Sequence, residues 1–260
     1  MYSKKDLILQ MQQMGLRADD TVLIHTSMRA VGAVEGGADS LLDAFCEYLC
    51  RGLFLVPTHT WMSVNAENPV YDVRTSVSCI GIVPVRAAAR QDGFRSLHPT
   101  HSMWGFGADA ETFLQGEENA HSPCPPGFCW DRLADRGAKL LLIGVGHDRD
   151  TFLHSVDERA GLTDRLGDPF AVTIIDRNGN RLESHICGHS CSKAEDVADC
   201  YVNFDEPFLR TGVQTLGKLG DAVVRIVDAA AAQALVLKIY ARGEEEMFLR
   251  YGTIPEELYR

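Results

Sequence analysis

The pattern of apolar and polar positions in the first quarter of the chain alternates between helix and strand. Apolar residues recur at helical spacing over residues 4–14, and Gly15 ends that stretch. The β-branched run 21–25 predicts a short strand, residues 39–50 predict a second helix, and the apolar run 53–57 predicts a second strand. This alternation is typical of an α/β fold.

The middle of the chain predicts a long loop followed by further α/β units. Residues 58–80 lack periodicity and carry aromatic and polar groups, which is typical of a loop over a site. A helix is expected over 82–90, a loop and strand over 94–106, and a short helix over 130–137. The apolar run 139–144 is the strongest strand signal.

The last third of the chain predicts a hairpin and then helices. Residues 171–175 and 181–186 flank a turn and should pair as antiparallel strands, so we expect a mixed sheet. Residues 213–216 and 222–238, with the acidic tail from Glu244, are expected to form a final helical half.

Composition narrows the class of protein. The 260 residues are 45% hydrophobic and 23% charged, which excludes a disordered or fibrous chain. No linker or repeat divides them, so we expect one domain, 1–260, with a central mixed sheet flanked by helices. A formal charge of −11 argues against nucleic acid as a partner and suits a cationic ligand.

Two absences in the sequence predict a cytoplasmic protein. No apolar run approaches the roughly 20 residues that span a bilayer, so we expect no membrane partner, and the start of the chain is amphipathic rather than a signal peptide. Eight cysteines are too dilute for a disulfide-framed fold, and we expect most of them to be thiols.

The sharpest local signal lies in residues 150–158, directly after the strand 139–144. His154 and Glu158 are four residues apart and share one face of the expected helix, with Thr151 one turn earlier. A carboxylate there would hold the imidazole's tautomer and leave the other nitrogen to take a proton, as in a general base. An ordinary surface pair has the same spacing and remains the alternative.

Two other segments carry groups suited to a cofactor. His25 ends a strand, and Thr26 and Ser27 after it offer amides and hydroxyls for an anion or a thioester carbonyl. Residues 95–102, RSLHPTHS, combine a guanidinium, two imidazoles and three hydroxyls, which suits phosphate or amide groups. A capped turn and an exposed polar loop are the respective alternatives.

Three further patterns compete with this interpretation. Arg149 stands where the dinucleotide fingerprint of 144–146 needs a glycine, which argues against a nicotinamide-type fold. The alternating His and Cys of 185–191 would span roughly 20 Å along a strand, too far for one ion. In a loop they would fit zinc, so a metal site, a substrate-facing loop and a structural turn stay open. Cys124 and Cys129 show no activating surroundings for a thiolate nucleophile.

With these residues assembled, the chain resembles the aminoglycoside 3-N-acetyltransferase family. Four blocks occur in the family's order between about residues 1 and 165: LIHTSMRAVGAVEGGADSLLDAF, GLFLVPTHT, FRSLHPTHSMWGFGADA and LLLIGVGHDRDTFLHSVDE. A weaker match, YVNFDEPFLRTGVQTLGKLGDAVVRIVDA, covers residues 201–229. The resemblance implies transfer of an acetyl group from acetyl-CoA directly to an amine, without a metal or an acyl-enzyme.

The resemblance also implies roles for individual residues. The active histidine maps onto His154, with Glu158 as its companion, Thr151 ahead of it and His25 in a second loop. The expected coenzyme contacts are Thr26, Ser27, Met28, Arg29, Val31, Gly32, Arg95, Ser96, His98 and Ser102. Amides of residues 26–28, or a hydroxyl beside them, should bind the oxyanion of the tetrahedral intermediate.

The substrate is the least constrained expectation. The chain reads Ile80-Gly81 and Val85 where the family has a Met-Gly pair and a glutamate, and residues 185–200 depart from the acidic segment that helps to read aminoglycosides. We expect Asp72, Glu67, Glu195 and Asp196 to attract a 2-deoxystreptamine aminoglycoside for acetylation at its 3-amino group, by a monomer or homodimer. A different small amine, a zinc-dependent hydrolase and a noncatalytic amine- or coenzyme-binding protein are the alternatives.

Overall fold

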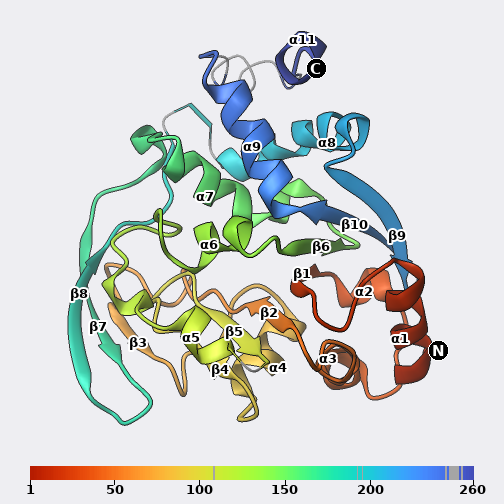
Figure 1. Cartoon of the computed structure of the whole chain (residues 1–260). Helices are drawn as coiled ribbons and strands as arrows, with labels where there is room; N and C mark the ends of the chain where they lie inside the picture. Colours follow the sequence, from red (N-terminus) through yellow and green to blue (C-terminus); the bar gives the residue numbers. More distant parts are fainter. Residues whose placement is uncertain (108, 192, 195, 244, 246–251, 253) are drawn as a thin grey trace.

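A seven-stranded mixed sheet divides the molecule into two helical layers (Figure 1). The computed structural model describes residues 1–260 except 108, 192, 195, 244, 246–251 and 253. In the order in which they lie side by side, the strands are β4 (Phe94–Arg95), β5 (Met103–Phe106), β2 (Leu53–Pro57), β1 (Thr21–Thr26), β6 (Lys139–Ile143), β10 (Ala222–Asp228) and β9 (Gln214–Leu219). The mixed α/β architecture predicted from the sequence is confirmed.

The three central strands are parallel. β1 pairs with β2 on one side and with β6 on the other, both in parallel, whereas the outer strands pair antiparallel. Parallel strands covered by helices on both faces need apolar side chains in both directions. The runs in β2 and β6 meet that need, since β2 is buried throughout and only Lys139 of β6 is not.

Helices cover both faces of this sheet. One core cluster joins the sheet to α1 (Lys4–Gln13), α2 (Met28–Val31), α3 (Gly37–Tyr48) and α4 (Ile82–Ala89). The other joins it to α5 (Ala110–Leu114), α6 (Cys129–Asp135), α7 (Thr151–Arg159), α8 (Asp205–Thr211), α9 (Ala229–Tyr240) and α11 (Glu256–Tyr259). Single-turn or irregular helices η1 (Glu117–Asn119), η2 (His147–Arg149), η3 (Thr163–Arg165) and η4 (Val197–Phe204) connect these elements.

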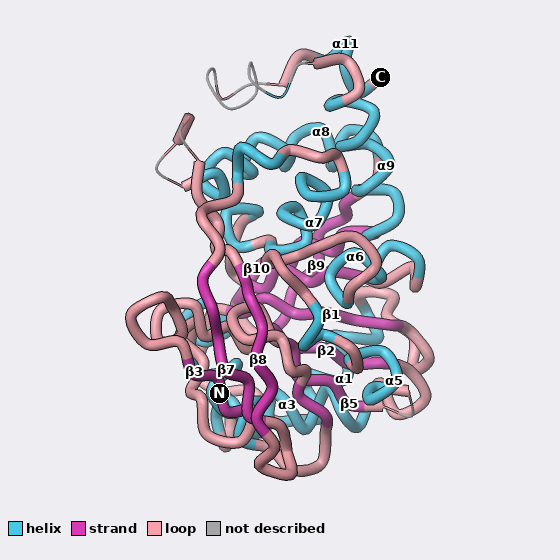
Figure 2. Tube along the Cα trace, turned by 90° about the vertical axis from the view of Figure 1, so that its left-hand side faces the viewer, coloured by secondary structure: helices cyan, strands magenta, loops and turns pink. Residues whose placement is uncertain are grey.

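A second, three-stranded sheet lies beside the first and faces the viewer in Figure 2. It consists of β3 (Val70–Asp72), β7 (Phe170–Ile175) and β8 (Arg181–Ile186), with β3 parallel to β7 and the hairpin β7–β8 antiparallel. The hairpin is the one predicted, but it forms this separate sheet, and β3 interrupts the long loop expected over 58–80. A small apolar cluster around Tyr71 and Ile174 holds it together.

The expectation of helix over 213–216 and over 222–228 is wrong. Residues 214–219 and 222–228 are the antiparallel strands β9 and β10, joined through Gly220 at a φ of +61°. The valines and isoleucine of β10 favour a strand, and pairing of β10 with the buried strand β6 stabilises it. Within 213–240 the helix is α9, residues 229–240, and most of the acidic tail from Glu244 lies outside the described residues.

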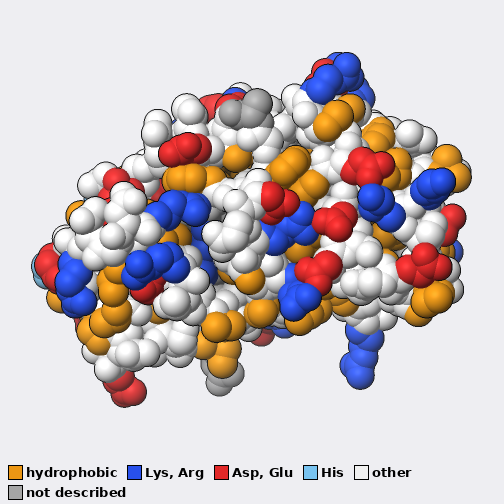
Figure 3. All heavy atoms as spheres, turned by 90° about the horizontal axis from the view of Figure 1, so that it is seen from below, with side chains coloured by type: hydrophobic (Ala, Val, Ile, Leu, Met, Phe, Trp, Pro, Cys, Tyr) orange, Lys and Arg blue, Asp and Glu red, His pale blue; other side chains and the backbone are white. Residues whose placement is uncertain are grey.

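The surface carries charges of both signs. On the face in Figure 3, acidic and basic side chains are interspersed with apolar ones, without a continuous basic area. Within the described part of the chain, no helix has the length and apolar character needed to cross a membrane.

Candidate active site

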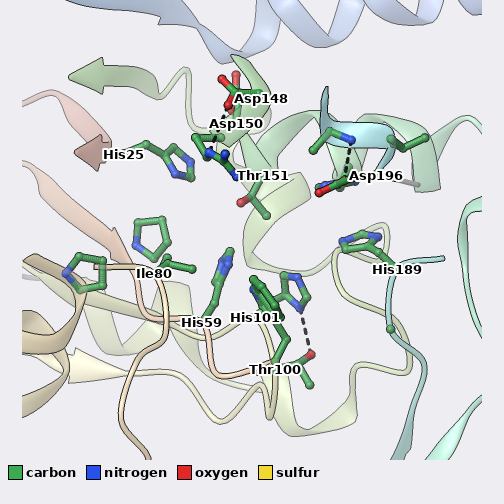
Figure 4. A pocket seen from close by; sticks show the side chains of 18 of the residues that line it. His25, His59, Ile80, Thr100, His101, Asp148, Asp150, Thr151, His189 and Asp196 are labelled. Atoms are coloured by element: carbon green, nitrogen blue, oxygen red, sulfur yellow. Dashed lines mark hydrogen bonds and ion pairs between the residues drawn. The ribbon is translucent and has the colours of Figure 1, made fainter. Parts of the chain in front are cut away.

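The carboxyl ends of the three parallel strands open into one cavity of about 690 Å³ (Figure 4). The end of β1 contributes His25, Thr26 and Ser27, and the end of β2 leads to His59. Beyond β6, the turn and the start of α7 contribute Asp150, Thr151 and His154. Open α/β sheets bind ligands at this edge, because there the strands end and the loops diverge.

Six of the residues singled out from the sequence line this cavity. They are His25, Thr26, Ser27, Thr151, His154 and Asp196. The two expected loops, around residues 26 and 154, therefore meet in space although about 130 positions separate them. The parallel pairing of β1 with β6 brings them together.

The hydrogen bonds of His154 define its tautomer. Nδ1 of His154 lies 3.0 Å from the hydroxyl of Tyr201, and that hydroxyl donates to the Asp157 carboxylate. A hydroxyl has one proton, so Nδ1 of His154 must carry its own proton and donate it to the Tyr201 oxygen. Nε2 of His154 therefore keeps a free lone pair, as a proton acceptor requires.

Asp157 is the centre of a buried network. Its carboxylate forms an ion pair with Arg165 and accepts a 2.8 Å hydrogen bond from the Tyr240 hydroxyl, besides the bond from Tyr201.

Burial lowers the pKa of His154 to about 3, and the Arg165 charge and His59 act in the same direction. His154 is therefore neutral at physiological pH.

Glu158 has other partners than the histidine with which the sequence paired it. Its carboxylate accepts from the Ser122 hydroxyl and, at 2.7 Å, from the backbone amide of Cys124. Burial raises its pKa to about 7. In this structure the carboxylate linked to His154, through Tyr201, is the neighbouring Asp157, which the spacing argument did not single out.

Of the run 95–102, Thr100 and His101 line the cavity, and the residues expected to contact coenzyme do not. Arg95 donates to the backbone oxygens of Ser76 and Thr58, at 2.7 and 3.0 Å, and so holds the loop 58–80. Ser102 also donates to the Thr58 oxygen, at 2.9 Å, and Ser96 accepts from the Met103 amide. His98 is fully buried. None of the four polar residues expected to contact coenzyme here (Arg95, Ser96, His98, Ser102) is among the described residues that line the cavity.

The residues after Ser27 also lie outside the cavity wall. Val31 belongs to a core cluster, and Met28 packs against it. Arg29 is exposed, and Gly32 adopts a φ of +84° with the Asp221 side chain beside it. These positions shape the loop rather than face the cavity.

The four expected acidic contacts are dispersed. Asp72 forms an ion pair with Arg74 at 2.7 Å, and Glu67 is exposed on a turn outside the cavity wall. Glu195 lies outside the described residues. Asp196 lines the cavity, and one of its oxygens accepts from the Ala198 amide at 2.9 Å.

Histidine rings that the sequence argument did not assign as site residues form much of the remaining wall. The ring of His189 stacks on that of His154 with centroids 3.8 Å apart, His101 lies 5.1 Å from His189, and His59 lies 4.6 Å from His101. The surrounding protein holds the pKa of each of the three well below its ordinary value, although His189 is open to the cavity. The part of the wall that these three rings form is therefore polar, and its rings are uncharged at neutral pH.

The segment 185–191 thus contributes a loop facing the cavity. Gly188 to Cys191 line it, whereas His185 is exposed on β8 and the Cys187 thiol donates to the His121 oxygen. Among the described residues, no group of three or more His, Cys, Asp or Glu has a metal-binding arrangement. Cys124 and Cys129 are fully buried, and burial holds their thiol pKa values well above the ordinary range.

Five buried polar atoms of residues on the wall have no hydrogen-bond partner among the described residues. They are His25 Nε2, Thr26 Oγ1, His59 Nε2, Asp150 Oδ1 and Arg165 Nε. Buried polar groups are rarely left unpaired, so these atoms indicate a polar ligand. The Ser27 amide, by contrast, already donates to the Ile143 oxygen at 2.9 Å, so one of the three amides expected to bind the oxyanion is occupied.

Comparisons with known proteins point to one family. The sequence profile of the aminoglycoside 3-N-acetyltransferases matches residues 23–241. Aminoglycoside N(3)-acetyltransferase IX of Micromonospora chalcea is 27% identical over 241 residues, which cover 83% of this chain and 85% of that protein.

Solved structures share the fold. AAC-VIa bound to sisomicin superposes with a TM-score of 0.78 at 24% identity, covering 93% of this chain and 98% of that one. The binary structure of AAC-IIIb with CoASH also gives 0.78, at 22% identity, covering 94% of this chain and 97% of that one.

Proposed function

The chain belongs to the aminoglycoside 3-N-acetyltransferase family, and we propose that it transfers an acetyl group from acetyl-CoA directly to the 3-amino group of a 2-deoxystreptamine aminoglycoside, with His154 as general base. The observation that carries the proposal is His154 itself, whose Nδ1 is hydrogen-bonded to Tyr201 while its side chain lines the cavity. The family profile supports the reaction. The relatives' names and their complexes with sisomicin and CoASH support both substrates.

The lowered pKa of His154 determines when it takes a proton. A base with a pKa of about 3 does not deprotonate an ammonium group, so the acceptor must reach the thioester as the free amine. Attack forms the C–N bond and leaves a positively charged nitrogen, which is far more acidic. Nε2 of His154 accepts the proton from that nitrogen, the C–S bond breaks, and the coenzyme A thiolate leaves and is protonated.

The oxyanion requires hydrogen-bond donors near the end of β1. The Thr26 hydroxyl, which has no partner among the described residues, and the Thr26 amide are our candidates, because the Ser27 amide donates to Ile143 and Met28 lies outside the cavity wall. One such donor contributes about 3 kcal/mol to transition-state stabilisation. Tyr201 and Asp157 act through His154 by keeping the proton on Nδ1.

Mass spectrometry tests the reaction. Gentamicin, tobramycin and apramycin are each incubated with acetyl-CoA and the protein, and we expect one added acetyl group on at least one of them. His154→Ala should lower turnover about 10²- to 10⁴-fold while coenzyme A still binds. No acetylated product from any of the three would refute the aminoglycoside assignment, and a stable acetyl-enzyme formed without amine would refute direct transfer.

One observation favours a second candidate substrate. His189 and its neighbours bring an uncharged ring to the cavity, and the described carboxylates on its wall are Asp148, Asp150 and Asp196. So few carboxylates suit an amine with fewer charges than an aminoglycoside. Thiol release from acetyl-CoA with a panel of small amines, in the absence of aminoglycoside acetylation, would support this alternative.

A further inference from the structure

Asp150 occupies the position before the first residue of α7, where a carboxylate ordinarily caps the helix. Its side chain makes no capping hydrogen bond. It is 2% exposed and lines the cavity instead, on the same side as His25 and Thr151 (Figure 4). The motif over residues 150–158 begins at this carboxylate, but the sequence argument assigned it no role.

One oxygen of Asp150 is held by the protein. Oδ2 of Asp150 lies 3.1 Å from Nδ1 of His147, and Nε2 of His147 lies 2.7 Å from the Gln214 carbonyl oxygen. The Gln214 amide is oriented by its own donation to Asp205. Oδ2 is thereby anchored, and the rest of the carboxylate is kept in one orientation.

The other oxygen has no partner. Oδ1 of Asp150 is buried and makes no hydrogen bond with any described residue. Two arginines on the cavity wall form ion pairs with other carboxylates, Arg149 with Asp148 and Arg165, whose Nε makes no hydrogen bond, with Asp157. A buried carboxylate oxygen left unpaired is costly, and the loss is recovered when a ligand donates to it.

The end of a helix and two imidazole rings surround the Asp150 carboxylate: His147 holds Oδ2, and His25 lies on the cavity side. The amino-terminal end of α7, a nine-residue helix, stabilises an anion at this position. His25 beside it is neutral, because burial lowers its pKa to about 4 even though Asp150 acts in the opposite direction. The cavity therefore presents an anion that suits a cationic donor.

We propose that Oδ1 of Asp150 binds an ammonium group of the acceptor other than the amine that is acetylated. The inference rests on the proposed function and names the contact that selects a polyamine. A carboxylate stabilises the protonated form of a bound amine, which suits a recognition contact and would hinder a nucleophile. The amide groups of coenzyme A are neutral donors and gain less from the charge.

Asp150→Asn is the direct test, with tobramycin as the acceptor. Asparagine can still accept from His147 through one atom while placing an N–H donor where Oδ1 was. We expect affinity for tobramycin, measured by titration calorimetry on the free protein, to fall about 10- to 100-fold, and the KM for tobramycin to rise in parallel. The KM for acetyl-CoA should stay within twofold of wild type.

Two variants control for charge and folding. Asp164→Asn removes the same charge from a surface ion pair with Lys193 and should leave tobramycin affinity unchanged. Asp150→Glu keeps the charge and should bind tobramycin more tightly than Asp150→Asn. It also allows the comparison with wild type if the asparagine variant is unstable.

The outcomes separate this inference from the proposed function. Unchanged tobramycin affinity in Asp150→Asn, or a loss confined to acetyl-CoA, overturns the assignment of Asp150 even if the wild-type protein acetylates tobramycin. If the wild type does not acetylate tobramycin, the proposed reaction on that acceptor fails. Calorimetry still decides the contact: loss of affinity in Asp150→Asn alone supports it, and absence of wild-type binding overturns it.

Discussion

His98 makes the stability of the fold depend on pH in a way that can be calculated. Its Nδ1 accepts from the Thr100 and His101 amides, at 3.2 and 2.8 Å, and its Nε2 lies 3.0 Å from the Ser122 oxygen. A proton on Nδ1 would oppose both amide donors, so the folded protein holds the neutral ring. Burial lowers the pKa of His98 from 6.5 to about 4.

The sign and size of the effect follow from linkage. The unfolded chain binds a proton to His98 below pH 6.5, whereas the folded chain does so only near pH 4, so stability is lost as the pH falls between these values. At about 1.4 kcal/mol per pKa unit, His98 alone contributes a loss of about 2 kcal/mol between pH 7.5 and 4.5. His25 and His154 add to the loss in the same direction.

Urea unfolding at the two pH values, followed by tryptophan fluorescence, measures this contribution. In His98→Asn the amide oxygen can replace Nδ1 as acceptor, while the bond to Ser122 is lost at a cost of about 1 kcal/mol at both pH values. We expect the free energy of unfolding of the variant to fall by about 2 kcal/mol less than that of wild type on acidification. His121→Asn, at an exposed position, controls for removing a histidine. Equal pH dependence in His98→Asn and wild type would refute the reasoning.

Three further predictions concern the groups around His154. In steady-state assays, Tyr201→Phe should lower kcat about 10- to 100-fold and leave the acceptor KM within threefold of wild type, because His154 loses the partner that holds its proton on Nδ1. An unchanged kcat would count against that role of Tyr201. The kcat/KM for tobramycin should rise with pH as the amine loses its proton. It should show no histidine inflection near pH 6.5, since the pKa of His154 is about 3. An inflection near 6.5 that disappears in His154→Gln would contradict the low pKa of His154. Glu158→Gln should stabilise the protein by about 1–2 kcal/mol at pH 8 and much less at pH 5, measured by urea titration. Folding raises the pKa of Glu158 from 4.5 to about 7, so the wild-type protein loses stability as the pH rises through that window. The same stability difference at both pH values would contradict this prediction.

The local sequence pattern was sufficient to predict strands that are buried on both faces of the sheet, because such strands need a continuous apolar run. The strand over 53–57 was predicted with its observed bounds, and the helix over 82–90 ends within one residue of its prediction. The pattern failed over 213–228, where a valine-rich stretch precedes an alanine-rich helix and the two read as one element. Pairing with β6, a contact distant in sequence, separates them.

In the candidate site, too, the sequence identified residues that follow strong strand signals and missed those that depend on distant contacts. His25 and His154 were identifiable because each follows a strong strand signal, and the parallel pairing of β1 and β6 brings them into one cavity. The choice between Asp157 and Glu158 was not available from spacing, since both lie within about one turn of His154. It depends on Tyr201, which arrives from η4, and on Ser122, which arrives from the proline-rich loop.

Burial of the histidines links the site's chemistry to its stability. The low pKa of His154 arises chiefly from desolvation, and the same cause keeps the rings of His25 and His98 neutral. In the proposed mechanism, a histidine with so low a pKa does not take a proton from an ammonium group, so the proton moves after the C–N bond has formed. The proposed recognition of the charged acceptor is then a task of carboxylates such as Asp150, which are separate from the base, and the same buried histidines make the fold sensitive to acid.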